Sequence, residues 1–80
     1  MEKRIKIKYD READAIYIYL RDLPYAYGVD LDNHRRVDYA LDKKPIGIEL
    51  LSVSKGIILE GLPEQEEVGS LLEKRFKVFA

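Results

Sequence analysis

The acidic run Asp10, Glu12 and Asp14 is the pattern in this chain that most resembles a chemical site. Carboxylates in a short loop can bind hard cations, but a calcium loop of the EF-hand type also needs a glycine at its bend and a bidentate glutamate at its end. The chain continues instead as the apolar segment 15–18. Short carboxylates commonly accept backbone N–H groups two or three residues further on. We therefore expect Asp10 and Asp14 to be structural residues that close a turn, and we expect no metal here.

Other groups that catalysis uses are sparse and scattered. The single histidine, His34, lies in a predicted turn at residues 32–34 without a nearby Ser, Cys or second His, so we expect a solvated turn residue. The sequence contains no Gly-rich phosphate loop, nucleophile elbow or metal-ligand helix, so we expect no catalytic residues and no cofactor. An alternative is a small hydrolase or ligand binder whose carboxylates converge on one pocket. Its candidate residues are Asp10, Asp14, Asp38 and Glu49.

The length of 80 residues predicts a single domain over 1–80. A chain this short buries only about 60–65% of its unfolded surface, and small domains usually compensate with disulfides, a metal or oligomerisation. The absence of cysteine excludes disulfides and thiolate metal sites, and one histidine argues against a histidine-based zinc site. Oligomerisation remains, so we expect a homodimer.

The charges are balanced along the chain. Fourteen basic and 15 acidic residues give a formal net charge of −1 with no block of one sign, which argues against nucleic acid or a membrane surface as the partner. The charged fraction of 36% is high and is typical of a thermophilic source. Residues 1–10 have no apolar signal-peptide region, and no stretch has transmembrane length. We expect a soluble cytoplasmic protein.

Hydrophobic periodicity predicts a small antiparallel sheet of four to five strands, connected like a meander, over residues 1–56. Residues 4–9 alternate between polar and apolar, which is typical of a half-buried strand. Residues 15–20 have apolar or aromatic side chains on both faces, so this strand is predicted to be central. Further strands are predicted at 25–31, 37–41 and 46–51, with Gly28 as the candidate for a bulge and 42–45 as a hairpin loop.

One helix is predicted from Pro63 to Lys77, within a C-terminal helical appendage at 57–80. Acidic residues at its start and basic residues at its end suit the helix dipole. Its apolar stripe predicts that Val68, Leu71 and Leu72 pack on one face of the sheet. The fold class is therefore α+β, an antiparallel sheet with one C-terminal helix on one face.

Two blocks of the sequence resemble a family of small prokaryotic proteins known as domain of unknown function 2283. The first block, residues 9–18, follows the family pattern Y-D-x-x-A-D-A-L-Y-I with Ile16 in place of leucine. The second, residues 37–54, follows V-D-Y, then G-I-E-I-L-x-x-S, with Leu50 in place of isoleucine. Residues 41–45 depart from the acidic glycine turn that the family commonly has before G-I-E, which puts a family-wide acidic site there in doubt. The resemblance implies a small antiparallel sheet with a helical appendage, no established activity, and members that sit beside toxin-like partners.

We expect a non-enzymatic module that forms homo-oligomers or binds another protein, because one short helix covers only one face of such a sheet. Tyrosine combines a large buried area with a polar group, and it is enriched at interfaces. An alternative is an antitoxin-like partner of a small toxin protein, with the tail 74–80 ordering on binding. A third possibility is that the aromatic residues simply belong to the core. The interface candidates are Tyr17, Tyr19, Tyr25, Tyr27, Phe76 and Phe79, on the tyrosine-bearing side of the sheet or in the tail.

Overall fold

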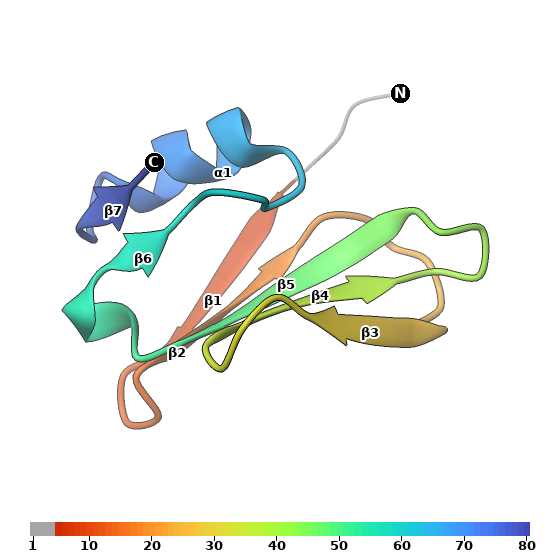
Figure 1. Cartoon of the computed structure of the whole chain (residues 1–80), viewed down its shortest axis with the longest axis horizontal. Coiled ribbons are helices and arrows are strands. Elements are labelled where there is room, and N and C mark those ends of the chain that lie inside the picture. Colours follow the sequence, from red (N-terminus) through yellow and green to blue (C-terminus); the bar gives the residue numbers. More distant parts are fainter. Residues whose placement is uncertain (1–4) are drawn as a thin grey trace.

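The computed structural model describes residues 5–80, and its main element is a five-stranded antiparallel sheet in the order β1-β2-β5-β4-β3 (Figure 1). Arg4, the predicted start of the first strand, lies outside the described residues. The molecule is mostly β with one small helix, so the predicted α+β class is confirmed in this coarse form. The strands are β1 (Lys6–Asp10), β2 (Ala15–Tyr19), β3 (Tyr27–Asp30), β4 (Arg35–Tyr39) and β5 (Pro45–Leu51).

The predicted meander is wrong at one connection, because β2 pairs with β5 rather than with β3. After β2 the chain passes through Pro24 to the far edge of the sheet, and β3, β4 and β5 then lead back to β2. In the sheet, β5 pairs with β2 on one side and with β4 on the other. The middle strand is therefore β5, and β2 is interior between β1 and β5. The irregularity predicted at Gly28 lies instead in the β4–β5 pairing, between Asp38 and Tyr39.

The register divides the sheet into two faces of different character. Ile18 and Val37 both pair with Ile48, so their side chains lie on one face. The covered face is defined by the buried residues Ile16, Ile18, Val37, Ile48 and Leu50. The open face, on the opposite side, is defined by Tyr17, Tyr19, Arg36, Asp38 and Glu49. The open face carries the charged residues Arg36, Asp38 and Glu49 and is therefore not a second apolar face.

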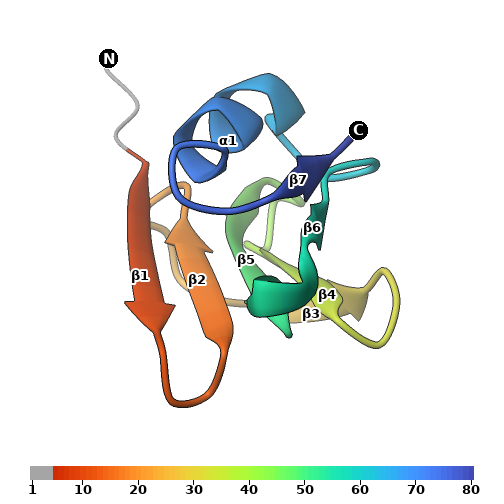
Figure 2. The ribbon, with the colours of Figure 1, turned by 90° about the vertical axis from the view of Figure 1, so that its left-hand side faces the viewer.

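A C-terminal layer packs on the covered face (Figure 2). It consists of the 3₁₀ turn η1 (Val53–Lys55), β6 (Ile57–Ile58), α1 (Gln65–Leu72) and β7 (Val78–Phe79). The short strands β6 and β7 are parallel, and the N–H of Leu59 donates to the carbonyl of Phe79 at 2.7 Å. Within residues 5–80, no helix has the length and apolar character needed to cross a membrane.

The predicted helix 63–77 is too long at both ends, because α1 has only eight residues. Its N-terminus is delayed by Glu64, which has a left-handed backbone (φ 54°). Its C-terminus comes early because residues 77–79 must extend to bond with β6, where the N–H of Ile57 donates to the carbonyl of Lys77 at 2.8 Å. A continued helix would use those backbone groups internally.

The buried side of α1 is also shifted from the predicted one. Val68 and Leu72 are fully buried as expected, but Leu71 is 37% exposed. Gly69 takes the remaining core-facing position, where an added Cβ would come within 2.7 Å of Leu59 Cδ1. The missing side chain lets the helix approach Leu59 closely, and this approach rotates Leu71 out of the core.

Candidate functional site

The acidic turn between β1 and β2 is connected to the C-terminal layer through Asp14. The Asp14 carboxylate accepts the backbone N–H of Ser54 at 2.9 Å and the Ser54 hydroxyl at 2.7 Å. The backbone carbonyl of Asp14 accepts the N–H of Val53 at 3.1 Å. Asp10 makes a local contact, accepting the N–H of Ala13 at 3.1 Å. These contacts occupy the two carboxylates with backbone and hydroxyl donors, and the structural role predicted for both residues is open to mutational test.

A chain of polar side chains crosses the open face from β2 to β3. The Tyr17 hydroxyl donates to Asp38 at 2.7 Å, and Arg36 Nε donates to the other Asp38 oxygen at 3.3 Å. Arg36 also contacts Asp30 at 3.1 Å and the Tyr25 hydroxyl at 3.1 Å. Burial, followed by the hydrogen bond to Asp38, raises the pKa of the Tyr17 phenol above its ordinary value. The predicted carboxylates thus separate into a turn pair (Asp10, Asp14) and an open-face pair (Asp38, Glu49) on neighbouring strands.

Gly47 completes the open-face arrangement. An added Cβ at this position would lie 2.5 Å from Tyr17 Cζ, so the tyrosine ring rests directly on the glycine backbone. This close approach brings the Tyr17 hydroxyl over β5 to reach Asp38 on β4. A glycine inside a predicted strand is the sequence signal for such an approach.

The six interface candidates do not form one surface. Tyr17 and Tyr19 lie on the open face, with ring centroids 4.7 Å apart. Tyr27 belongs to the opposite side of the sheet and stacks on Tyr39 at 5.2 Å. Of the others, Tyr25 reaches Arg36 through its hydroxyl, Phe76 packs edge-on against Tyr9 at 5.0 Å, and Phe79 is half exposed in β7.

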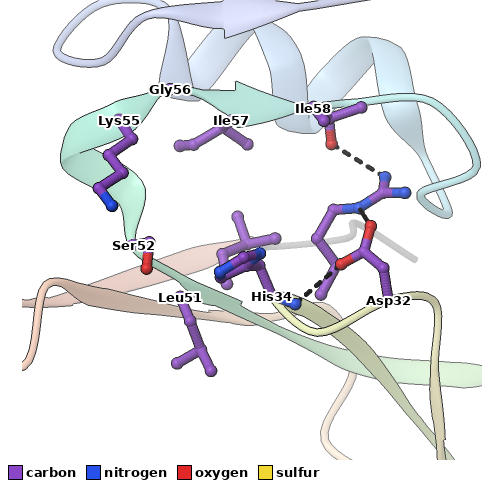
Figure 3. A pocket seen from close by; sticks show the side chains of 10 residues that line it. Asp32, His34, Leu51, Ser52, Lys55, Gly56, Ile57 and Ile58 are labelled. Carbon is purple, nitrogen blue, oxygen red and sulfur yellow. Dashed lines mark hydrogen bonds and ion pairs between the residues drawn. The ribbon is translucent and has the colours of Figure 1, made fainter.

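A pocket of about 160 Å³ lies where β5 leaves the sheet, between the β3–β4 turn and the segment η1–β6 (Figure 3). Leu50 and Ile57 are buried and form its apolar part, while His34 and Lys55 approach from opposite sides. The predicted turn at 32–34 is present, with the His34 N–H donating to Asp32 at 2.8 Å, but His34 is also a pocket residue.

Arg35 holds one wall of this pocket in place. Its Nε donates to Asp32 at 2.8 Å, and its Nη1 donates to the carbonyls of Ile58, at 3.0 Å, and Glu60. The His34 N–H and then the Arg35 side chain hold the pKa of Asp32 below its ordinary value. Sequence reasoning missed Arg35, although an available signal was its spacing of two from Val37, which places a cation on the apolar side of β4.

Carboxylate clusters that would suggest a metal site do not occur in the described part of the chain. Among residues 5–80, no group of three or more His, Asp or Glu side chains is arranged to hold a metal ion.

The fold and these contacts define a small α+β domain whose sheet is covered on one face by a short C-terminal layer. A family model described as "Protein of unknown function (DUF2283)" matches residues 6–54. The chain belongs to this family, and the resemblance found in the sequence is confirmed. The comparisons with curated proteins and with solved structures gave no match.

The two sequence blocks that carry the family resemblance contact each other in the fold. Asp14 of the first block bonds Ser54 of the second, and Tyr17 of the first bonds Asp38 of the second while its ring rests on Gly47. The matched region contains the five-stranded sheet and reaches η1. The two blocks therefore stabilise the same part of the fold, because these contacts join segments that are distant in the sequence.

Tyr17→Phe is expected to lower the free energy of unfolding at pH 7 by about 0.5–1.5 kcal/mol, the usual contribution of one hydrogen bond. The raised pKa means that Tyr17 stabilises the fold below its ordinary value of 10.0 and that this contribution is lost as the pH rises through the folded pKa. The wild type should therefore lose stability above about pH 10 more steeply than the variant. Urea titrations between pH 7 and 11 measure both effects. Tyr19→Phe is the matched control, and identical behaviour of both variants would contradict the role of the Tyr17–Asp38 bond.

Proposed function

We propose that the protein is a non-enzymatic interaction module that forms a homodimer through the free edge of β3. The observation that carries this proposal is a row of exposed apolar side chains on this edge strand. Tyr27 is 39% exposed, Val29 is 43% exposed and Leu31, directly after the strand, is 38% exposed, although Ile18, Val37 and Ile48 on the same side of the interior strands are buried. Edge strands offer unpaired backbone groups to another strand, and apolar ones are the most prone to such pairing.

The hydrogen-bonding pattern of β3 supports pairing at this edge. The N–H of Leu31 donates to the backbone carbonyl of Arg35 at 2.7 Å, so it is directed toward the interior of the sheet. Backbone groups alternate in direction along an antiparallel strand, so those of Gly28 and Asp30 are directed toward the free edge. An incoming strand would therefore bond to Gly28 and Asp30.

A second copy of β3 fits this edge in antiparallel register centred on Val29. Val29 then faces Val29 of the second copy, and Tyr27 faces Leu31, so the two apolar rows become continuous. In this register Gly28 faces Asp30 of the second copy. Within one copy, the Arg36 side chain lies against Gly28, where an added Cβ would be 2.6 Å from Arg36 Nε. Asp30 of one copy thus approaches Arg36 of the other, and opposite charges across the pair favour this register.

The antitoxin-like alternative draws less support from the arrangement of the chain. The tail 74–80 was its candidate for ordering on binding, but residues Val78–Phe79 already pair with β6 and Phe76 packs on Tyr9. A second copy at β3 is therefore the occupant that we propose.

Val29→Cys is expected to form an intermolecular disulfide on mild oxidation. In the proposed register the two Val29 residues form a non-hydrogen-bonded pair with a Cα–Cα distance of about 4.5 Å, within the range of disulfides. The chain has no cysteine of its own, so a covalent dimer on a non-reducing gel reports this contact alone.

Leu41→Cys is the matched control, because Leu41 is highly exposed but lies in the β4–β5 loop. It should cross-link much more slowly than Val29→Cys at the same concentration. Sedimentation equilibrium of the wild type at micromolar concentration provides the direct measurement. A single species of 9.3 kDa would contradict the homodimer. A dimer in which Tyr19→Cys cross-links faster than Val29→Cys would place the interface on the open face.

A further inference from the structure

We propose that the pocket between η1–β6 and the β3–β4 turn is a binding site for a small monocarboxylate with a short apolar tail. The inference goes beyond the proposed dimer, since the pocket includes neither Gly28 nor Asp30. It rests on the charge balance, the unused donors and the shape of the pocket.

The charged groups around the pocket favour an anion. Lys55 and Arg35 are cationic, and among the described residues that line the pocket Asp32 alone is acidic. Asp32 already accepts hydrogen bonds from the His34 N–H and from Arg35 Nε, at 2.8 Å each. An anionic ligand would therefore lie near two cationic side chains, while the one carboxylate, Asp32, is already hydrogen-bonded to His34 and Arg35.

Several donors around the pocket are available to such a ligand. Within residues 5–80, no hydrogen bond or ion pair is found for the side chains of Lys55 and His34, and Arg35 uses Nε and Nη1 but not Nη2. Lys55 lies on the η1 side of the pocket and His34 on the side of the β3–β4 turn (Figure 3). A carboxylate that binds in the pocket would accept hydrogen bonds from both side chains. The bond from the Lys55 ammonium would be charge-assisted, and charge-assisted bonds are the stronger kind.

The rest of the pocket is apolar and small. Leu50 and Ile57 are buried in its wall and offer apolar contacts to the tail of a ligand. The volume of about 160 Å³ is close to that of a cavity which holds benzene, roughly six carbon atoms. A monocarboxylate of about six to eight non-hydrogen atoms matches the charge, the donors and the volume.

The experiment is an NMR titration of the ¹⁵N-labelled full chain with 3-methylbutanoate. Backbone amide shifts are expected to change in a saturable way and to centre on residues 32–35 and 50–58. Two related probes separate the contributions: 3-methylbutanamide has the same shape without the charge, and acetate has the charge without the tail. Both are expected to bind at least about tenfold more weakly, because each lacks one of the two recognised features.

Lys55→Ala is expected to weaken binding of 3-methylbutanoate about tenfold, through loss of one charge-assisted hydrogen bond. Lys74→Ala is the matched control, since Lys74 is an exposed lysine outside the pocket, and it should bind as the wild type does. Unchanged urea midpoints for both variants would show that the fold is retained.

Three results would overturn the site. These are the absence of saturable shifts in the wild type, equal binding of the amide or of inorganic phosphate, and equal weakening by the two lysine substitutions. The cross-linking of Val29→Cys is measured without any ligand, so a failure of the pocket and a failure of the dimer are distinguishable.

Discussion

Leu72→Ala is expected to lower the free energy of unfolding by about 2–5 kcal/mol, the range for a leucine removed from a packed core. Leu72 is 1% exposed and belongs to the core cluster that joins α1 to the covered face of the sheet. Alanine would leave a cavity at the one helix that closes this core. Because a domain of this size has only about 5–15 kcal/mol of total stability, the variant should be close to unfolding at 37 °C. Urea denaturation followed by circular dichroism, at one fixed protein concentration, measures the change.

Leu71→Ala is the matched control, since it makes the same chemical change one residue earlier in α1. Leu71 is partly exposed beside Tyr9 and Phe76, so its truncation should cost less than about 1 kcal/mol. Equal losses for the two variants would mean that α1 is rotated from the observed position. A larger loss of stability for Leu71→Ala than for Leu72→Ala would mean that Leu71 is buried, as the sequence predicted.

Asp14→Ala is expected to lower the free energy of unfolding by about 1.5–4 kcal/mol, the sum of two separable effects. The first is loss of the two hydrogen bonds to Ser54, at 2.9 and 2.7 Å, which resemble those of a helix cap. The second is backbone strain, because Asp14 has a φ of 55°, where alanine is disfavoured by roughly 1–2 kcal/mol. Urea denaturation of Asp14→Gly separates these effects, since glycine removes the carboxylate without the strain and should be less harmful than alanine.

Asp10→Ala provides a comparison within the same turn. Asp10 accepts one exposed hydrogen bond, from the Ala13 N–H, so its loss should cost about 0.5–2 kcal/mol. The structural interpretation of both residues would be wrong if either alanine variant kept its stability and lost affinity for Ca²⁺ or Mg²⁺. Titration of the wild type and both variants with each cation completes the test.

Strand positions were predictable from the sequence because they depend on local periodicity. The alternation in residues 4–9 and the doubly apolar residues 15–20 predicted β1 and β2 close to their observed bounds. The segments 25–31, 37–41 and 46–51 predicted β3, β4 and β5. The helix was predicted in place but not in length or rotation. Its C-terminal end depends on β6, whose two residues gave no clear periodic signal.

The sequence by itself determined the strands of the main sheet, the apolar residues and the turns that carry acidic residues, because these are properties of near neighbours along the chain. Only the tertiary structure decided that β2 pairs with β5, that Asp14 bonds Ser54 forty residues away, and that Arg35 reaches the carbonyl of Ile58. The candidate pocket depends on the same long-range choices, since its walls come from residues 32–35 and 50–58. Such pairings are selected by the burial of whole faces against each other, and that energy belongs to the folded chain rather than to any single segment.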